Sequence, residues 1–347
     1  MKRSARKSRL GVIGTLGILS LAAGCQPTPD VRTGREFRAT TPPPKYAVAK
    51  DVPLDSALRE SAETELVKEL GNSDPNVRAH AVEALQAATG DKHGAELIAA
   101  LSDKDPLVRY SACLAVGTAR VDGAKESLAK LVDDKDSGVR VTARYALHRL
   151  GVFTYSHDLE RLTHDPEPRV RGTTAMVLGM IGDKSGAQLL RHLRKDPVAA
   201  VRQQAAVSLW KLGDDQGMTD LVGWTISNYE DDEKVALLGL ADARNRNVIQ
   251  HIRAHLTDDA PEVSLVAARA MGMLGSDEGL GVVHQHLASR DPRERVLAAL
   301  ALADIGRSDS QNSLRQLAAD PQPDVRIAAS QAILQLKPHF VEEHPQG

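Results

Sequence analysis

The stretch "VRQQAAVSLWKLG" (residues 201–213) has a sister copy immediately upstream, "VRGTTAMVLGMIG" (residues 170–182), and the two align without a gap. The largest difference is that Trp210 stands where the upstream copy has Gly179. The leading residue recurs at the same fixed interval in nine copies, at Val77, Val108, Val139, Val170, Val201, Asp232, Val263, Glu294 and Val325. A fixed period of this length indicates a repeat architecture.

Each copy predicts a helical hairpin. The residues four and eight places after the leading residue, such as Ala205 and Leu209, are mostly small or apolar and share one helical face. A leucine, isoleucine or valine eleven places before it indicates a preceding helix, and turns such as "SDPN" and "KDPL" separate the two helices. A glycine twelve places after the leading residue, Gly213 in this copy, ends the second helix.

The pattern therefore predicts an all-α fold, an α-solenoid (armadillo/HEAT-like superhelix) of nine helical hairpins, each of which spans one period. One hairpin alone cannot bury its apolar stripe, whereas stacked hairpins share a continuous core. With about 8–10 Å between packed helices, nine units are expected to form a rod or arc roughly 80 Å long.

Motifs such as "DPNVRAHAVEAL", "DPLVRYSACLAVG" and "PDVRIAASQAIL" resemble HEAT repeats of the short kind also found in phycobilin lyases, over residues 56–337. The resemblance implies that the arginine after each leading residue pairs with a turn aspartate, in a ladder that links the repeats. The expected acidic partners are Asp74, Asp105, Asp136 and Asp291. The arginines of the ladder are Arg78, Arg109, Arg140, Arg171, Arg202, Arg295 and Arg326. Glu233 and Ser264 replace the arginine, so the ladder is expected to be interrupted in the sixth and seventh repeats.

Five basic residues followed by an apolar run indicate that the N-terminus is a targeting segment. The stretch "LSLAAGC" (residues 19–25) resembles the lipobox of bacterial lipoproteins, which implies cleavage before Cys25 and lipidation of Cys25 with palmitate-type chains. An ordinary cleaved signal peptide is the alternative. Gln26 after the cysteine implies sorting to the outer membrane of a two-membrane bacterium, facing the periplasm.

Four segments follow from this reading: a lipoprotein signal peptide (1–24), the lipidated cysteine with a Pro-rich tether (25–55), the repeat domain (56–337) and a C-terminal tail (338–347). The chain has a formal net charge of −2, and removal of the five positive charges of residues 1–24 lowers it to −7. An acidic protein is a poor candidate for binding nucleic acid, which requires lysine and arginine against phosphates.

The concave face is the predicted binding surface. Residues two, six and nine places after the leading residue point away from the core, and in HEAT-like solenoids this helix lines the concave side. Among the eighteen residues at the first two of these places, the three charged ones are Glu83, Lys234 and Arg269. Contiguous exposed apolar surface tends to mark binding sites. The predicted partner-binding residues are Tyr110, Leu114, Tyr145, Met176, Val207, Trp210, Leu238, Leu265, Val296 and Leu300. Two alternatives are that curvature packs these residues against neighbouring helices, or that a homodimer covers them.

A histidine cluster is a weaker candidate site. His251 and His255 are four places apart on one helical face, and His286 occupies the position of His255 one repeat later, so the three are weak candidate ligands for a metal. A partly buried histidine is the ordinary interpretation, because other repeats have leucine there. The chain has no Gly-rich phosphate loop, no G-x-S-x-G and no H-E-x-x-H.

The sequence thus predicts a membrane-anchored scaffold that binds a partner protein along its concave, apolar face, with no enzymatic activity and no cofactor. Three alternatives stay open: a bilin-lyase-like enzyme or a chaperone, as the family resemblance implies, and a metal-binding envelope protein that uses His251, His255 and His286.

Overall fold

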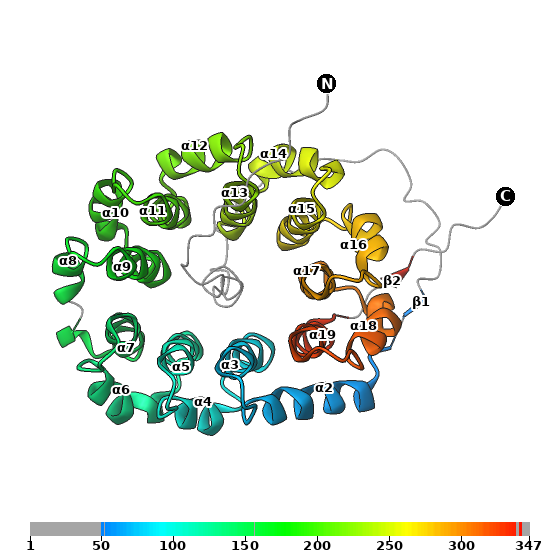
Figure 1. Ribbon diagram of the computed structural model, residues 1–347, viewed down its shortest axis with the longest axis horizontal. Coiled ribbons are helices and arrows are strands. Elements are labelled where there is room, and N and C mark those ends of the chain that lie inside the picture. Colours follow the sequence, from blue (N-terminus) through cyan, green and yellow to red (C-terminus); the bar gives the residue numbers. More distant parts are fainter. Residues whose placement is uncertain (1–49, 52, 156, 338–339, 342–347) are drawn as a thin grey trace, which may run out of the picture.

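The computed structural model of the protein describes residues 50–51, 53–155, 157–337 and 340–341. The predicted signal peptide, Cys25, most of the predicted tether and most of the C-terminal tail lie outside the described residues. Helices fill the segment from Ser56 to Gln335 in pairs, one outer and one inner helix to each repeat (Figure 1). Short 3-10 turns precede or extend several outer helices.

The outer helices are α2 (Ser56–Glu69), α4 (Gly94–Ala100), α6 (Lys125–Leu131), α8 (Asp158–Leu162), α10 (Ala187–Leu193), α12 (Asp215–Trp224), α14 (Ile249–Arg253), α16 (Leu280–His286) and α18 (Gln311–Leu317). The inner helices are α3 (Pro75–Thr89), α5 (Pro106–Ala119), α7 (Ser137–Arg149), α9 (Pro168–Ile181), α11 (Ala199–Lys211), α13 (Glu230–Asp242), α15 (Pro261–Met273), α17 (Pro292–Ile305) and α19 (Pro323–Gln335). The predicted α-solenoid of helical hairpins is confirmed over these residues.

Local sequence sets the ends of the inner helices. The carboxylate of Asp74 accepts the backbone N–H of Asn76 and caps α3, while Pro75 fills the first helical position, where no N–H is needed. Asp105 and Asp291 cap α5 and α17 in the same way, and Asp136 caps α7 by accepting the backbone N–H of Val139. At the other end, α9 stops at Gly182, whose φ of 79° lies in the left-handed region that glycine enters without strain.

The solenoid closes into a ring instead of forming the open rod or arc expected from the sequence (Figure 1). The last inner helix, α19, packs against both α2 and α3 of the first repeat. Across this junction Arg59 donates to the carbonyl of Ile333 at 3.0 Å, and Gln335 donates to the carbonyl of Ala87 at 2.9 Å. Each repeat turns by a small angle relative to its neighbour, and these rotations add up around the stack to bring its two ends together.

The chain segments that flank the ring also meet. Strand β1 (Lys50–Asp51) pairs antiparallel with β2 (Phe340–Val341), with Lys50 opposite Val341. Over the part of the chain that the structure describes, none of the helices has the length and apolar character needed to cross a lipid bilayer.

An arginine–aspartate ladder links successive repeats. Arg78 donates from Nε and Nη2 to the carboxylate of Asp103, both at 2.8 Å, while Nη1 donates to the carbonyl of Asn72 at 2.9 Å. The same bidentate arrangement joins Arg109 to Asp134, Arg171 to Asp196, and Arg295 to Asp320. A fork of two parallel N–H bonds fixes geometry as well as contributing energy.

The expected acidic partners were wrong by two positions. Asp105 and its equivalents Asp74, Asp136 and Asp291 cap their own helices, whereas the aspartate two places earlier, such as Asp103, faces the arginine of the preceding repeat. The ladder weakens at two rungs: within the described residues, Arg140 and Arg202 keep the bonds to carbonyls of their own turns but have no bidentate pair with an aspartate of the next repeat. Glu233 and Ser264 occupy the next two arginine positions, in the region where the hydrophobic core also divides into two clusters.

Candidate functional site

The inner wall of the ring is the concave face predicted to bind a partner. Its apolar residues are far less exposed than the sequence suggested: Leu114, Tyr145, Met176, Val207, Trp210, Leu238, Leu265 and Leu300 are all at most 6% exposed. Tyr110 and Val296 are half-buried. The prediction that these ten side chains form an exposed apolar groove is wrong.

Curvature explains their burial. The hydroxyl of Tyr110 on α5 donates to the sulfur of Met176 on α9 at 3.9 Å, which brings together side chains from alternate inner helices in front of α7. Tyr145 of α7 lies with its hydroxyl 3.1 Å from that of Thr118 on α5. In a closed ring the inner side chains converge and cover one another, so the alternative that curvature packs these residues is correct.

Trp210 is a packing residue of the inner wall. It is 4% exposed, and its indole Nε1 donates to the carbonyl of Leu240 on α13 at 3.0 Å. At the equivalent position of α9, a Cβ on Gly179 would lie 2.6 Å from Ser208 Oγ, so α9 and α11 approach closely there. The exchange of glycine for tryptophan therefore reflects two different helix contacts. Between α9 and α11 the helices are too close for a side chain at Gly179, whereas α11 and α13 enclose a buried indole whose N–H is hydrogen-bonded.

The wall from α11 to α17 carries charges that pair with one another. Lys234 of α13 contacts Glu262 of α15 at 2.6 Å, and Arg269 of α15 contacts Asp304 of α17 at 2.7 Å. Two further residues, Lys211 and Asp242, pair at 2.8 Å between α11 and α13. These ion pairs join neighbouring inner helices.

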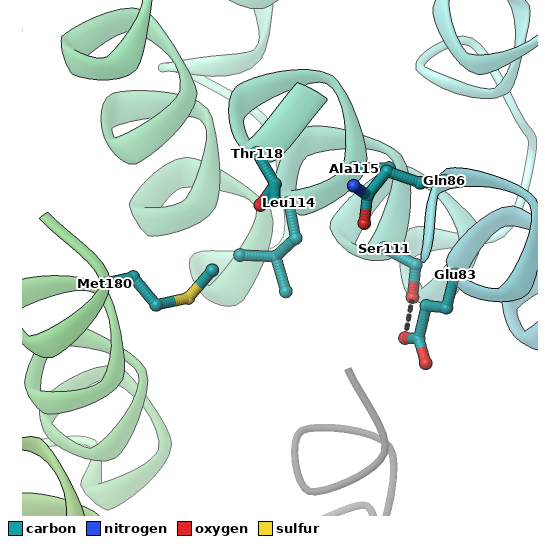
Figure 2. A pocket seen from close by; sticks show the side chains of 7 residues that line it. All are labelled: Glu83, Gln86, Ser111, Leu114, Ala115, Thr118 and Met180. Atoms are coloured by element: carbon teal, nitrogen blue, oxygen red, sulfur yellow. Dashed lines mark hydrogen bonds between the residues drawn. The ribbon is translucent and has the colours of Figure 1, made fainter. Parts of the chain in front are cut away.

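Figure 2 shows the sector from α3 to α9, where side chains from α3, α5 and α9 surround a small cavity of about 10 Å³. Glu83 accepts a hydrogen bond from the hydroxyl of Ser111 at 2.7 Å, and Leu114 and Met180 form the apolar side of the cavity (Figure 2). Burial raises the pKa of Glu83 to about 7, against the opposing effects of the Ser111 hydrogen bond and the charge of His80. The sequence marked Glu83 only as a charge in an apolar column, because a single sequence does not show how far the ring desolvates it.

The three histidines proposed as metal ligands do not come together. His251 is exposed, and His286 is hydrogen-bonded through Nδ1 to Glu294 at 2.8 Å. His255 instead lies beside Glu233 and Asp258. Cys113 is fully buried, and burial raises the pKa of its thiol to about 12. Such a thiol is a core residue and not a reactive one.

Part of the repeat region matches the model of a known protein family. The family model of HEAT repeats matches residues 63–148 and 157–241, that is, the outer and inner helices of the first six repeats. The match to HEAT repeats over these residues agrees with the hairpin pattern and with the resemblance inferred from the sequence motifs. No curated protein matches the chain.

Solved structures with HEAT-like folds are similar to this chain at low identity. The complex of CpcE and CpcF of phycocyanin lyase from Nostoc is 21% identical, covers 73% of this chain and 98% of that chain, and has a TM-score of 0.44. Human deoxyhypusine hydroxylase in complex with glycerol is 20% identical, covers 72% of this chain and 98% of that chain, and has a TM-score of 0.37.

Proposed function

We propose that this ring of HEAT repeats is a protein-interaction scaffold that binds a partner protein at its inner wall and has no catalytic activity of its own. Repeat proteins use their extended concave surfaces for binding, because every repeat contributes residues to one continuous face. The inner helices of this ring contribute to such a face (Figure 1).

The observation that carries the proposal is the apolar sector of the wall formed by α5, α7 and α9. Partly exposed Tyr110, Thr118 and Met180 lie there around buried Leu114 and Met176. A rim of accessible side chains around a tightly packed centre is the arrangement found in protein interfaces. In the sector from α11 to α17, ion pairs join neighbouring inner helices, so a partner that used these charged groups would first have to break an internal contact.

Site-specific crosslinking tests this proposal. A photo-crosslinking amino acid placed at Met180 or at Thr118 is expected to capture the same partner in the native envelope, because both side chains lie at the inner wall (Figure 2). The matched control is the same substitution at Ile226, which is 76% exposed in the turn between α12 and α13 and is expected to capture nothing specific. Equal capture at Ile226, or none at the inner positions, would remove the inner wall as the binding surface.

We also propose that the scaffold is anchored to the outer membrane, facing the periplasm, through a lipid on Cys25. The support is the lipobox-like stretch at residues 19–25 followed by Gln26. Fractionation of cells that produce the native chain or a Cys25→Ser variant tests it: the native chain is expected in the outer-membrane fraction and the variant outside it. An ordinary cleaved signal peptide would instead give the same soluble fraction for both chains.

A further inference from the structure

Three side chains of types that can bind a metal lie close together, one on α13 and two in the segment that follows α14. Glu233 of α13 is fully buried. His255 and Asp258 follow α14, with side chains 12% and 11% exposed, and His255 Nδ1 lies 3.7 Å from Asp258 Oδ2. One ligand atom of each of the three residues lies within 4.8 Å of the others.

The register of the ladder explains why these residues meet. In intact rungs the arginine and its aspartate are 25 residues apart, as in Arg78–Asp103 and Arg295–Asp320. Glu233 and Asp258 have the same separation in the chain, and Glu233 stands at the arginine position. The aspartate of the rung is thus retained while its cation is replaced by a second carboxylate.

This exchange places two carboxylates together at a buried location, and a like-charge pair in low dielectric is costly. The imidazole of His255 lies beside both carboxylates. A divalent cation at the place of the missing guanidinium offsets both, and it takes imidazole nitrogen and carboxylate oxygen as ligands without further change.

The neighbouring repeat leaves space beside this group. A cavity of about 560 Å³ is lined by Asp258, Ser264, Glu278 and His286 among others. Ser264 is the next arginine position of the ladder, so the small side chain there accounts for part of the opening. The cavity adjoins the group at Asp258, so a cation can approach from solvent on that side and water can complete its coordination.

We propose that Glu233, His255 and Asp258 form a binding site for one divalent transition-metal ion, Zn²⁺ or Mn²⁺, which takes the structural place of a ladder arginine. One imidazole and two carboxylates suit these ions, and Asp258 of the site also lines the neighbouring cavity. The site is independent of the inner wall and of any partner bound there, so a failure of the proposed function leaves it untouched.

Metal titration of the metal-free full chain tests the site. Isothermal calorimetry with Zn²⁺ alone, and separately with Mn²⁺ alone, is expected to show one saturable equivalent for at least one ion, and saturation is expected to raise the melting temperature. Co²⁺ should bind at the same site and give visible absorption bands that Zn²⁺ or Mn²⁺ displaces. No saturable equivalent with either ion would overturn the proposal.

The ladder itself supplies the decisive variant. Glu233→Arg restores the rung to Asp258, so this variant is expected to remain folded without metal and to lose the equivalent, with affinity at least 100-fold weaker. Glu233→Gln is a nearly isosteric second variant and is expected to weaken binding at least tenfold. Binding that persists unchanged in Glu233→Arg would place the metal elsewhere and overturn the assignment.

His251→Gln is the matched control, because His251 is exposed and lies one helical turn before His255. This variant is expected to bind like the native chain, whereas His255→Gln loses the equivalent. If His251→Gln or His286→Gln weakened binding as much as His255→Gln, the ligands would be the three histidines of the sequence-based hypothesis, and the site described here would be wrong.

Discussion

Arg326 of the last repeat donates from Nη2 to Oε1 of Glu69 in the first repeat at 2.6 Å, and the two residues are 257 positions apart in the chain. The same guanidinium donates from Nε to Glu65 at 2.6 Å and from Nη1 to the carbonyl of Asp320 at 3.0 Å. The arginine ladder therefore continues across the junction of the ring, with two glutamates of α2 in place of the usual aspartate. Arginine–carboxylate pairs therefore join successive repeats and also join the last repeat to the first.

Arg326→Ala is expected to lower the free energy of unfolding by about 3 kcal/mol, because it leaves Glu69, which is 3% exposed, without the guanidinium that its carboxylate accepts from. Urea unfolding measures the loss, and small-angle X-ray scattering is expected to show an increased radius of gyration as the closure loosens.

The matched control is Arg315→Ala, which removes another ion pair across the same junction, to Asp55. That pair is 50% and 39% exposed, so its loss is expected to cost less than about 1 kcal/mol. Equal losses from the two variants would show that Arg326 has no special part in closing the ring.

Trp210→Ala is expected to destabilise the fold by about 3–5 kcal/mol, because it removes a buried indole and leaves the carbonyl of Leu240 without its donor. Chemical denaturation of the variant measures this. Phe153→Ala is the control, since Phe153 is 57% exposed and its removal is expected to change stability little. A Trp210→Ala chain that kept native stability but no longer crosslinked its partner would return Trp210 to the binding surface.

The sequence was sufficient for the helix pairs and for the ends of the helices. The fixed repeat period, the aspartate caps such as Asp105 and the left-handed Gly182 depend on neighbours within one hairpin, and the structure has them where the pattern placed them. The apolar offsets four and eight likewise gave the buried face of each inner helix, as at Ala205 and Leu209.

The global features could not be predicted because they depend on the sum of small rotations between repeats. An offset gives the direction of Tyr145 but not the curvature that brings Tyr110 and Met176 together in front of it. Closure pairs Arg326 with Glu65 and Glu69, which no periodic pattern relates to it. The Glu233–Asp258 pair was different: its signal, the spacing of a ladder rung, was present in the sequence, but the aspartate of the cap was taken for the aspartate of the ladder.

Cys113 is expected to resist alkylation in the folded protein. Its thiol is fully buried, and burial raises its pKa to about 12, so almost none of the reactive thiolate is present at pH 8. Iodoacetamide labelling of a Cys25→Ser chain, in which Cys113 is the one remaining thiol, measures the rate by mass spectrometry. Labelling is expected to be slow in buffer and fast in urea; fast labelling of the folded chain would contradict the packing of α5.

Glu83 gives the inner wall a pH dependence of known sign. Its pKa in the folded state is about 7, raised by burial from an ordinary value of 4.5. Between these two pH values the unfolded chain releases a proton that the folded chain keeps, so the stability of the ring falls as the pH rises from 4.5 to 7 and then stays level. Replacing Glu83 with glutamine keeps an acceptor for the Ser111 hydroxyl and removes this titration.

Glu83→Gln and the native chain are therefore expected to have similar stability at pH 4.5, and the variant is expected to be more stable at pH 8 by about 1 kcal/mol. This is less than the full pKa shift would give, because Glu83 is partly exposed and solvent screens its charge. Urea unfolding at several pH values measures the difference between the two chains, in which the titrations that they share cancel. Glu126→Gln, a change at an exposed glutamate of α6, controls for the loss of one surface charge. A constant difference across pH would show that the wall does not hold Glu83 in its protonated form.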